Sequence, residues 1–263
     1  MCWVERIKVY FATGILFLLA TVAYGDSQHQ SSQPISGIEK VFEYTGTKFG
    51  VPFLKATIKI EDGSLEEGRS LFQVHAVFHS LEYLGFLFRM NNRFTSTIEA
   101  ESCSPVRYVK EVDQEGLLIE KKSYLQTLTF DSSNQKVVVE KKGGEERQEV
   151  SLPSGTYDPL SMFARCYLKE ELHPGQDIHM SIYDGVKLRQ LTFHSRKEKV
   201  KSKMYGKVEA VRLESSTSFS SFGDREGTLR IWYLTDGGKT PILIELELPI
   251  GKVKFELESV YGS

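Results

Sequence analysis

Short segments rich in β-branched and aromatic residues, separated by turn-forming stretches, make up most of this sequence. In residues 71–78 the side chains alternate: Phe72, Val74, Ala76 and Phe78 share one side, and polar residues occupy most of the other. Because neighbouring side chains of a strand point to opposite faces, this period of two predicts a strand with one buried face. Similar segments occur at residues 41–44, 56–60, 94–99, 107–113, 124–130, 136–140, 178–183, 186–194, 206–214, 227–234, 242–248 and 252–261.

The connections between these segments are short, which favours an antiparallel meander. Asp184-Gly185 is typical of a two-residue hairpin turn, and that turn would place His179 opposite Gln190. Gly143-Gly144 predicts an edge hairpin after residues 136–142, and the charged run 141–148 reads as a solvated loop. Residues 81–88 fit either a helical turn or a buried strand. A sheet of this many strands must curl or close, so we expect a mainly β fold with one strongly curved antiparallel sheet or open barrel.

One helix is predicted, over residues 158–172. Asp158 is a good N-cap, Pro159 suits the first helical position, and Pro174-Gly175 ends the pattern. The apolar residues fall at helical spacing on one stripe, formed by Leu160, Phe163, Ala164 and Tyr167. We therefore expect this helix to pack against the sheet.

The N-terminus has the pattern of an export signal. Basic Arg6 and Lys8 precede an apolar run over residues 9–23, and Ala23-Tyr24-Gly25 supplies small residues for cleavage before Asp26. This divides the chain into a signal peptide (1–25), a flexible leader (26–37) and a single β domain (38–263). We expect a periplasmic protein without a membrane span after cleavage. An uncleaved N-terminal anchor is the alternative, although the run is shorter than the roughly 20 residues of a comfortable span.

Charge and cysteine content restrict the partners. The whole chain has 33 Lys and Arg and 35 Asp and Glu, so loss of Glu5, Arg6 and Lys8 leaves 31 and 34, a net charge of −3. This balance gives no basic face for nucleic acid, and we expect no nucleic-acid partner. Cys103 and Cys166 remain after cleavage, and either form a disulfide or stay as two buried thiols.

The sequence contains no recognisable catalytic or metal-binding pattern. His75 and His79 would pair on a helix, but on the predicted strand they lie about 13 Å apart. There is no Gly-x-Ser-x-Gly elbow, phosphate-binding glycine loop or paired-cysteine spacing. Ser161 lies three residues after Asp158, where a hydroxyl completes a capping box. We therefore predict a protein without enzymatic activity, bound metal or cofactor.

The second half of the chain carries a group of residues in a characteristic order. They are Asp158-Pro159-Leu160-Ser161 with Arg165, Pro174-Gly175, Asp184-Gly185, Gly227-x-Leu229-x-Ile231-Trp232, Asp236, Pro241 and Gly251. Together with Phe42-x-Tyr44 and Gly50, they make residues 38–261 resemble the domain of unknown function 3108 family, a group of exported bacterial proteins. The resemblance implies a signal peptide and a mainly β domain, with Asp158, Pro159, Ser161, Gly185, Gly227, Pro241 and Gly251 as a structural signature. It implies no mechanism.

Three residues are candidates for ligand binding. Arg165 could bind an anionic group, or pair with a nearby carboxylate or strand-end carbonyl. Trp232 and Tyr233 could line a cavity between helix and sheet, or belong to the core. The leading hypothesis is a periplasmic carrier of an apolar or amphiphilic ligand, such as a lipid or a lipoprotein acyl chain. The alternatives are an envelope adaptor acting through protein contacts and, less favoured, a hydrolase; the sequence does not set the oligomeric state.

Overall fold

The computed structural model describes residues 37, 39–66, 68–85, 87–117, 121–142, 146–219, 225–248 and 251–262. The expected signal peptide (1–25) and nearly all of the leader (26–37) lie outside these residues, so cleavage and the alternative anchor stay predictions. The predicted turns at Gly143-Gly144 and Pro249-Ile250 also lie outside them.

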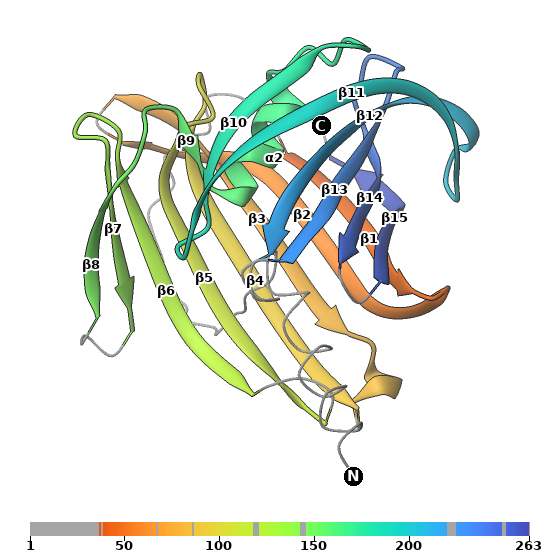
Figure 1. Ribbon diagram of the computed structural model, residues 1–263, viewed down its shortest axis with the longest axis horizontal. Coiled ribbons are helices and arrows are strands. Elements are labelled where there is room, and N and C mark those ends of the chain that lie inside the picture. The colour runs from red at the N-terminus through yellow and green to blue at the C-terminus, as the bar shows by residue number, and fades with distance from the viewer. Residues whose placement is uncertain are drawn as a thin grey trace.

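The described residues form one large sheet and one α-helix (Figure 1). The strands are β1 (Glu39–Lys48), β2 (Val51–Glu66), β3 (Arg69–Ser80), β4 (Phe88–Glu99), β5 (Pro105–Gly116), β6 (Lys122–Asp131), β7 (Lys136–Lys141), β8 (Arg147–Ser151), β9 (Thr156–Tyr157), β10 (Asp177–Tyr183), β11 (Leu188–Ser202), β12 (Gly206–Phe219), β13 (Arg225–Leu234), β14 (Pro241–Leu248) and β15 (Gly251–Tyr261). The helix is α2 (Pro159–Leu168), and a single 3₁₀ turn, η1, covers Glu82–Leu84. The expected mainly β fold with one packed helix is confirmed.

The sheet consists of two meanders that are joined by the pairing of β1 with β15, the first and last strands. Its order is β8-β7-β6-β5-β4-β3-β2-β1-β15-β14-β13-β12-β11-β10-β9, and only β9, paired with β10, is parallel to its neighbour. The edge strands β8 and β9 are separated in the chain only by residues 152–155. Since so short a link reaches at most about 18 Å, the two edges of the sheet must lie close together. The sheet therefore curls into an open barrel with a seam between its edges (Figure 1).

The inner face of the barrel has the alternation that the sequence predicts. Phe72, Val74, Ala76 and Phe78 of β3 are all buried. Ile60, Ile58 and Ala56 continue the apolar surface on β2, whereas β4 alternates the apolar Ile98 and Phe94 with the buried polar Ser96 and Asn92. Phe78 meets Phe255 of β15 edge to face, with ring centroids 5.9 Å apart, which joins the two halves of the barrel across the interior.

Helix α2 lies inside the concave sheet, near one end of the barrel (Figure 1). The rings of Phe163 and Tyr167 make edge contacts to Phe42 of β1, at centroid distances of 6.4 and 5.2 Å. The predicted stripe is thus the packed face, but the helix ends at Leu168 rather than at residue 172. The amides of residues 169 and 170 both donate to the carbonyl of Arg165, so the chain turns away before the Pro174-Gly175 stop is reached.

The structure corrects other details of the prediction. The β10–β11 connection has four residues, 184–187, because Tyr183 pairs with Leu188 and His179 therefore faces Thr192. The Asp184 side chain accepts from the backbone amides of residues 186 and 187, both at 2.8 Å, which stabilises the longer loop. In the ambiguous segment 81–88, Glu82–Leu84 form η1 and Phe88 begins β4. The charged run 141–148 was expected as a loop, but β8 begins within it and pairs with β7.

The start of α2 depends on the fully buried carboxylate of Asp158. It accepts hydrogen bonds from the amides of Leu160 (2.7 Å) and Ser161 (3.0 Å) and from the hydroxyl of Ser96 on β4 (2.6 Å). Burial raises the pKa of Asp158, and these hydrogen bonds oppose the rise. The Ser161 hydroxyl completes the predicted capping box by accepting from the Asp158 amide.

Asp158→Ala should lower the free energy of unfolding by about 2–4 kcal/mol, because it leaves three buried donors without an acceptor. Asp158→Asn keeps an acceptor at the cap and avoids burying a charge, so it should cost less than about 1 kcal/mol. Urea unfolding of the two variants measures the difference. Equal losses in both would show that the charge, and not the cap geometry, holds the helix in place.

Candidate functional site

An apolar inner cavity of about 90 Å³ lies between α2 and the concave face of the sheet. Its walls come from α2, from β1–β3 and from β10–β15, so both halves of the barrel contribute. Small side chains on two adjacent strands, Ala56 of β2 and Ala76 of β3, leave room opposite Leu160 and Phe163 of the helix. The cavity is suited to an apolar group, because almost every side chain around it is aliphatic or aromatic.

The inner cavity has one polar end, formed by Asp184 and Arg189. The Arg189 Nη1 lies 2.8 Å from Asp184 Oδ2, and both side chains are buried, with exposed fractions of 7% and 9%. Arg189 Nε also donates to the carbonyl of Ser218 at 2.8 Å. A buried ion pair of this kind is tolerated only when its remaining donors and acceptors are also hydrogen-bonded. The bond to the Ser218 carbonyl contributes to this.

Lys110 of β5 reaches the same region from the other half of the barrel. Its Nζ donates to the carbonyl of Asp184 at 2.8 Å. Burial lowers the pKa of Lys110 to about 8, and the nearby Asp184 charge offsets part of that effect. Burial, followed by the charge of Asp184, also raises the pKa of Tyr124 to about 12. The side chains of this region are therefore largely shielded from water.

A second, larger cavity of about 490 Å³ lies at the seam of the barrel. One wall is formed by β6, β7 and β8, and includes Gln126, Val139 and Gln148. The opposite wall is the β10–β11 connection, from Tyr183 to Leu188. This seam cavity mixes polar and apolar side chains, unlike the inner cavity.

The predicted ligand-binding residues are not brought together. Arg165 is about one-third exposed, pairs with Glu170 at 2.5 Å and lies over the ring of Tyr157, whose hydroxyl accepts from its Nη1. Trp232 lies on the opposite face of the sheet from the inner cavity, and the fully buried Tyr233 is not part of the cavity wall. The Tyr233 hydroxyl has no hydrogen-bond partner in the described part of the chain.

Cys103 and Cys166 are both buried and unpaired in the structure. Burial raises the pKa of Cys103 to about 11 and that of Cys166 to about 12. These thiols are therefore almost entirely protonated near neutral pH, which makes them poor nucleophiles.

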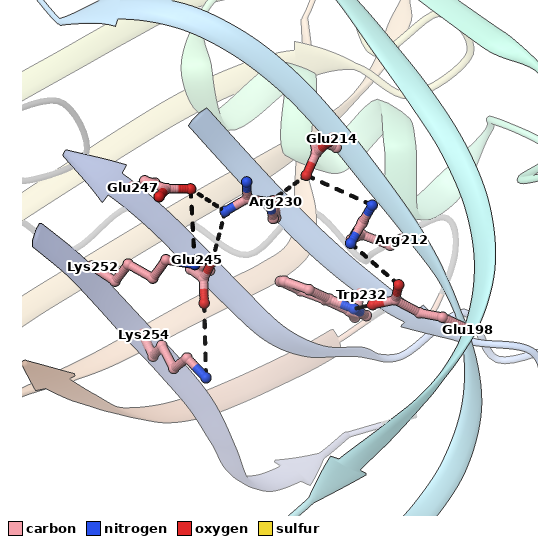
Figure 2. A network of polar contacts seen from close by, with 9 residues as sticks. All are labelled: Glu198, Arg212, Glu214, Arg230, Trp232, Glu245, Glu247, Lys252 and Lys254. Atoms are coloured by element: carbon pink, nitrogen blue, oxygen red, sulfur yellow. Dashed lines mark hydrogen bonds and ion pairs between the residues drawn. The ribbon is translucent and has the colours of Figure 1, made fainter. Parts of the chain in front are cut away.

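The outer face of β11–β15 carries a ladder of alternating charges (Figure 2). Arg230 is at its centre, with Nη1 at 2.7 Å from Glu245 and 2.6 Å from Glu247, and Nε bonded to Glu214. Burial alone would lower the pKa of Arg230, but these carboxylates raise it above its usual value. Trp232 Nε1 donates to Glu198 at 2.5 Å within the same network. Opposite charges face one another across strands here, so the ladder fixes register.

The described residues contain no group of three or more His, Cys, Asp or Glu residues arranged to hold a metal ion. None of the helices in the described ranges is long and apolar enough to cross a membrane.

Comparison with known proteins identifies the family. The family model "Protein of unknown function (DUF3108)" matches residues 41–258. The chain belongs to the DUF3108 family. No curated protein matches it. A solved structure with a similar fold is the beta-barrel-like protein of domain of unknown function DUF1849 from Brucella abortus, with a TM-score of 0.57 and 11% identity, covering 87% of this chain and 99% of that one.

The signature residues of this DUF3108 chain have structural positions. Asp158, Pro159 and Ser161 start α2, and the Pro241 carbonyl at the start of β14 accepts from the buried Tyr44 hydroxyl at 2.8 Å. Gly185, with φ of +88°, lies against β6, where a Cβ would come within 2.9 Å of the Gln126 side chain. Gly227 pairs with Thr217 within the β12–β13 ladder, and Gly251, with φ of +109°, begins β15.

Sequence reasoning missed Lys110, Gln126 and Arg189 as site residues. The sequence does contain a sign that Lys110 is buried, because Lys110 alternates in phase with Tyr108 and Val112, the inward-facing residues of β5. A lysine on the apolar side of a strand is the sequence sign of a buried charge. The partner across the barrel could not be found in this way, since it comes from a loop more than 70 residues later.

Lys110 should make stability depend on pH. Its pKa is about 8 in the folded protein and close to the ordinary 10.5 in the unfolded chain. Between these values the unfolded chain binds more protons, so the free energy of unfolding rises with pH. Relative to Lys110→Met, the wild-type protein should gain about 2–3 kcal/mol between pH 7 and pH 10.

Urea unfolding of both proteins at the two pH values measures this gain. Lys207→Met is the matched control, because Lys207 is an exposed lysine on β12. A difference between wild type and Lys110→Met that does not change with pH would contradict the burial of a titrating lysine at this position.

Proposed function

We propose that this protein is exported to the periplasm and binds an apolar or amphiphilic ligand, such as a lipid or lipoprotein acyl chain, without catalysing a reaction. The observation that carries the proposal is the apolar cavity that lies between α2 and the curved sheet. Concave apolar sites with a few convergent polar groups are the usual form of small-molecule binding sites. Asp184 and Arg189 provide such a polar end.

The size of the inner cavity limits what it can hold. Its volume of about 90 Å³ is below the roughly 300–1,000 Å³ of typical ligand pockets, and an engineered apolar cavity of about 150 Å³ accommodates benzene. We therefore expect the inner cavity to hold part of an acyl chain, with the rest of the ligand outside it.

The non-enzymatic part of the proposal rests on how the polar groups are used. Asp184 bonds Arg189 with one oxygen and two backbone amides with the other, and Lys110 binds a carbonyl. These groups are occupied in holding the loop, and none of them is paired with a serine, threonine or cysteine as an activated nucleophile would be. Export is supported by the N-terminal pattern of basic residues, apolar run and small residues.

The sheet edge favours one alternative, an envelope adaptor that acts through protein contacts. β8 (Arg147–Ser151) is the last strand on its side of the sheet, and most of its residues are exposed. An exposed edge strand is a template for pairing with an extended segment of another protein. Binding of a periplasmic protein that is lost when Val150 is replaced by proline would favour this reading.

Ala56→Leu should weaken binding of a fluorescent fatty acid, cis-parinaric acid, by at least about tenfold, because the added carbons fill much of the inner cavity. Thr57→Leu is the matched control, since Thr57 is the next residue of β2 and points to the opposite face. Fluorescence titration gives the affinities, and urea unfolding confirms that both variants fold. No binding to the wild-type protein, or equal binding to the two variants, would overturn the proposal.

Native mass spectrometry of protein purified from a bacterial periplasm gives a second test. The wild-type protein should carry a lipid-sized mass, and Ala56→Leu should lose it while Thr57→Leu keeps it. An unmodified mass for all three proteins would favour the adaptor over the carrier.

A further inference from the structure

The inner cavity and the seam cavity share a wall. The dividing loop, residues 184–187, joins β10 to β11. Asp184 lines the inner cavity, whereas residues 185–187 and the flanking Tyr183 and Leu188 line the seam cavity. This loop therefore lies between the two cavities.

Two side chains of the opposite half of the barrel hold the dividing loop. Lys110 Nζ donates to the carbonyl of Asp184 at 2.8 Å, and Gln126 Nε2 donates to the carbonyl of Gly185 at 3.5 Å. Lys110 and Gln126 are directly opposite each other on β5 and β6, so neighbouring positions bind successive carbonyls of the loop. Leu128, two residues further along β6, lies beneath Gly185.

This attachment is weaker than a strand ladder. β10 and β11 pair along their length with each other, but the two sheet edges are not joined by backbone pairing at the loop. The contact at 3.5 Å is at the long limit of a hydrogen bond. The shorter bond, from Lys110, comes from an ammonium group whose charged form is disfavoured by burial, which lowers the pKa to about 8. The Asp184–Arg189 ion pair joins the loop to its own half of the barrel. The loop can therefore part from β5 and β6 when the two contacts across the seam break, without unfolding the barrel.

We propose that residues 184–187 are a gate between the two cavities, and that a single-chain acyl amphiphile occupies both when the gate opens. The chain enters the inner cavity, and the polar end stays in the seam cavity near Gln126, Lys141 and Gln148. The seam cavity, at about 490 Å³, already lies within the range of ordinary ligand pockets, and the inner cavity adds about 90 Å³ lined almost entirely by apolar side chains. This inference rests on the proposed function, because it assigns that ligand a path and a position.

Gly185→Ala is the sharpest variant for this test. Its Cβ would lie 2.9 Å from Gln126 Oε1 and 3.1 Å from Leu128 Cδ1, on a backbone with φ of +88° that disfavours side chains. The substitution should push the loop away from β6. Gly206→Ala is the matched control at the opposite end of β11, because Gly206 has φ of +73° but no atom within 4 Å of its Cβ position.

Stopped-flow mixing with cis-parinaric acid measures the gate directly. Gly185→Ala should raise the association and dissociation rates together, by about tenfold, with a smaller change in Kd. Lys110→Met, which removes the stronger attachment, should act in the same direction, and Gly206→Ala should behave as wild type. Wild-type rates in both Gly185→Ala and Lys110→Met would overturn the gate, and Lys110→Met decides the matter where Gly185→Ala does not fold.

A ligand-free measurement separates the gate from the proposed function. Ala56→Cys places a thiol in the inner cavity, and its labelling by N-ethylmaleimide is followed by peptide mapping, which distinguishes it from Cys103 and Cys166. Combined with Gly185→Ala, labelling should be several-fold faster than with Gly206→Ala. Faster labelling without fatty-acid binding supports the gate and removes the lipid function, whereas equal labelling overturns the gate even where the fatty acid binds.

Discussion

The antiparallel pairing of β1 with β15 is the constraint on which the rest of this structure depends. It joins the strands nearest the two ends of the described chain, from Val41 opposite Tyr261 to Lys48 opposite Val253. Without it, β1–β8 and β10–β15 would be two separate curved sheets. The inner cavity needs both, because Ala56 and Ala76 come from the first and Ile231 and Ile244 from the second. Strand pairing between distant parts of the chain therefore creates the cavity in which the helix meets both walls.

A pairing of such high sequence separation has consequences for folding. The loop closed by β1 and β15 includes nearly the whole domain, and closing it costs conformational entropy before any contact is gained. Local hairpins and α2 can form first, so the barrel is expected to be completed late. Phe78 of β3 contacts Phe255 of β15 on the inner side of this strand pairing. The contact adds aromatic packing to the backbone hydrogen bonds between β1 and β15.

Much of this architecture could be predicted from local patterns. Alternation in residues 71–78 gave a correct buried face, and Asp158-Pro159 gave the start of α2 to the residue. These features depend on neighbouring residues alone. The predictions of the helix end and of the length of the β10–β11 loop were wrong, because each is set by interactions that the local pattern does not contain. Asp184-Gly185 satisfies a two-residue turn locally, but the Asp184 carboxylate is drawn inward to Arg189.

The same reasoning explains why the candidate site was harder to predict than the fold. Arg165 attracted attention because it is charged and lies on the helix, yet Glu170, five residues away, satisfies it. Lys110 looked ordinary in sequence, and becomes unusual only when the barrel closes and buries it against the carbonyl of Asp184. Burial of a cation is unfavourable unless the cation is hydrogen-bonded or paired, and a methionine would fill similar space without a charge. The retained lysine holds the one loop that divides the two cavities, and the strained Gly185 lets that loop approach β6 closely enough to be held. The contacts of Lys110 and Gln126 thus join β5 and β6 to the β10–β11 loop across the seam, where the described strands form no backbone ladder.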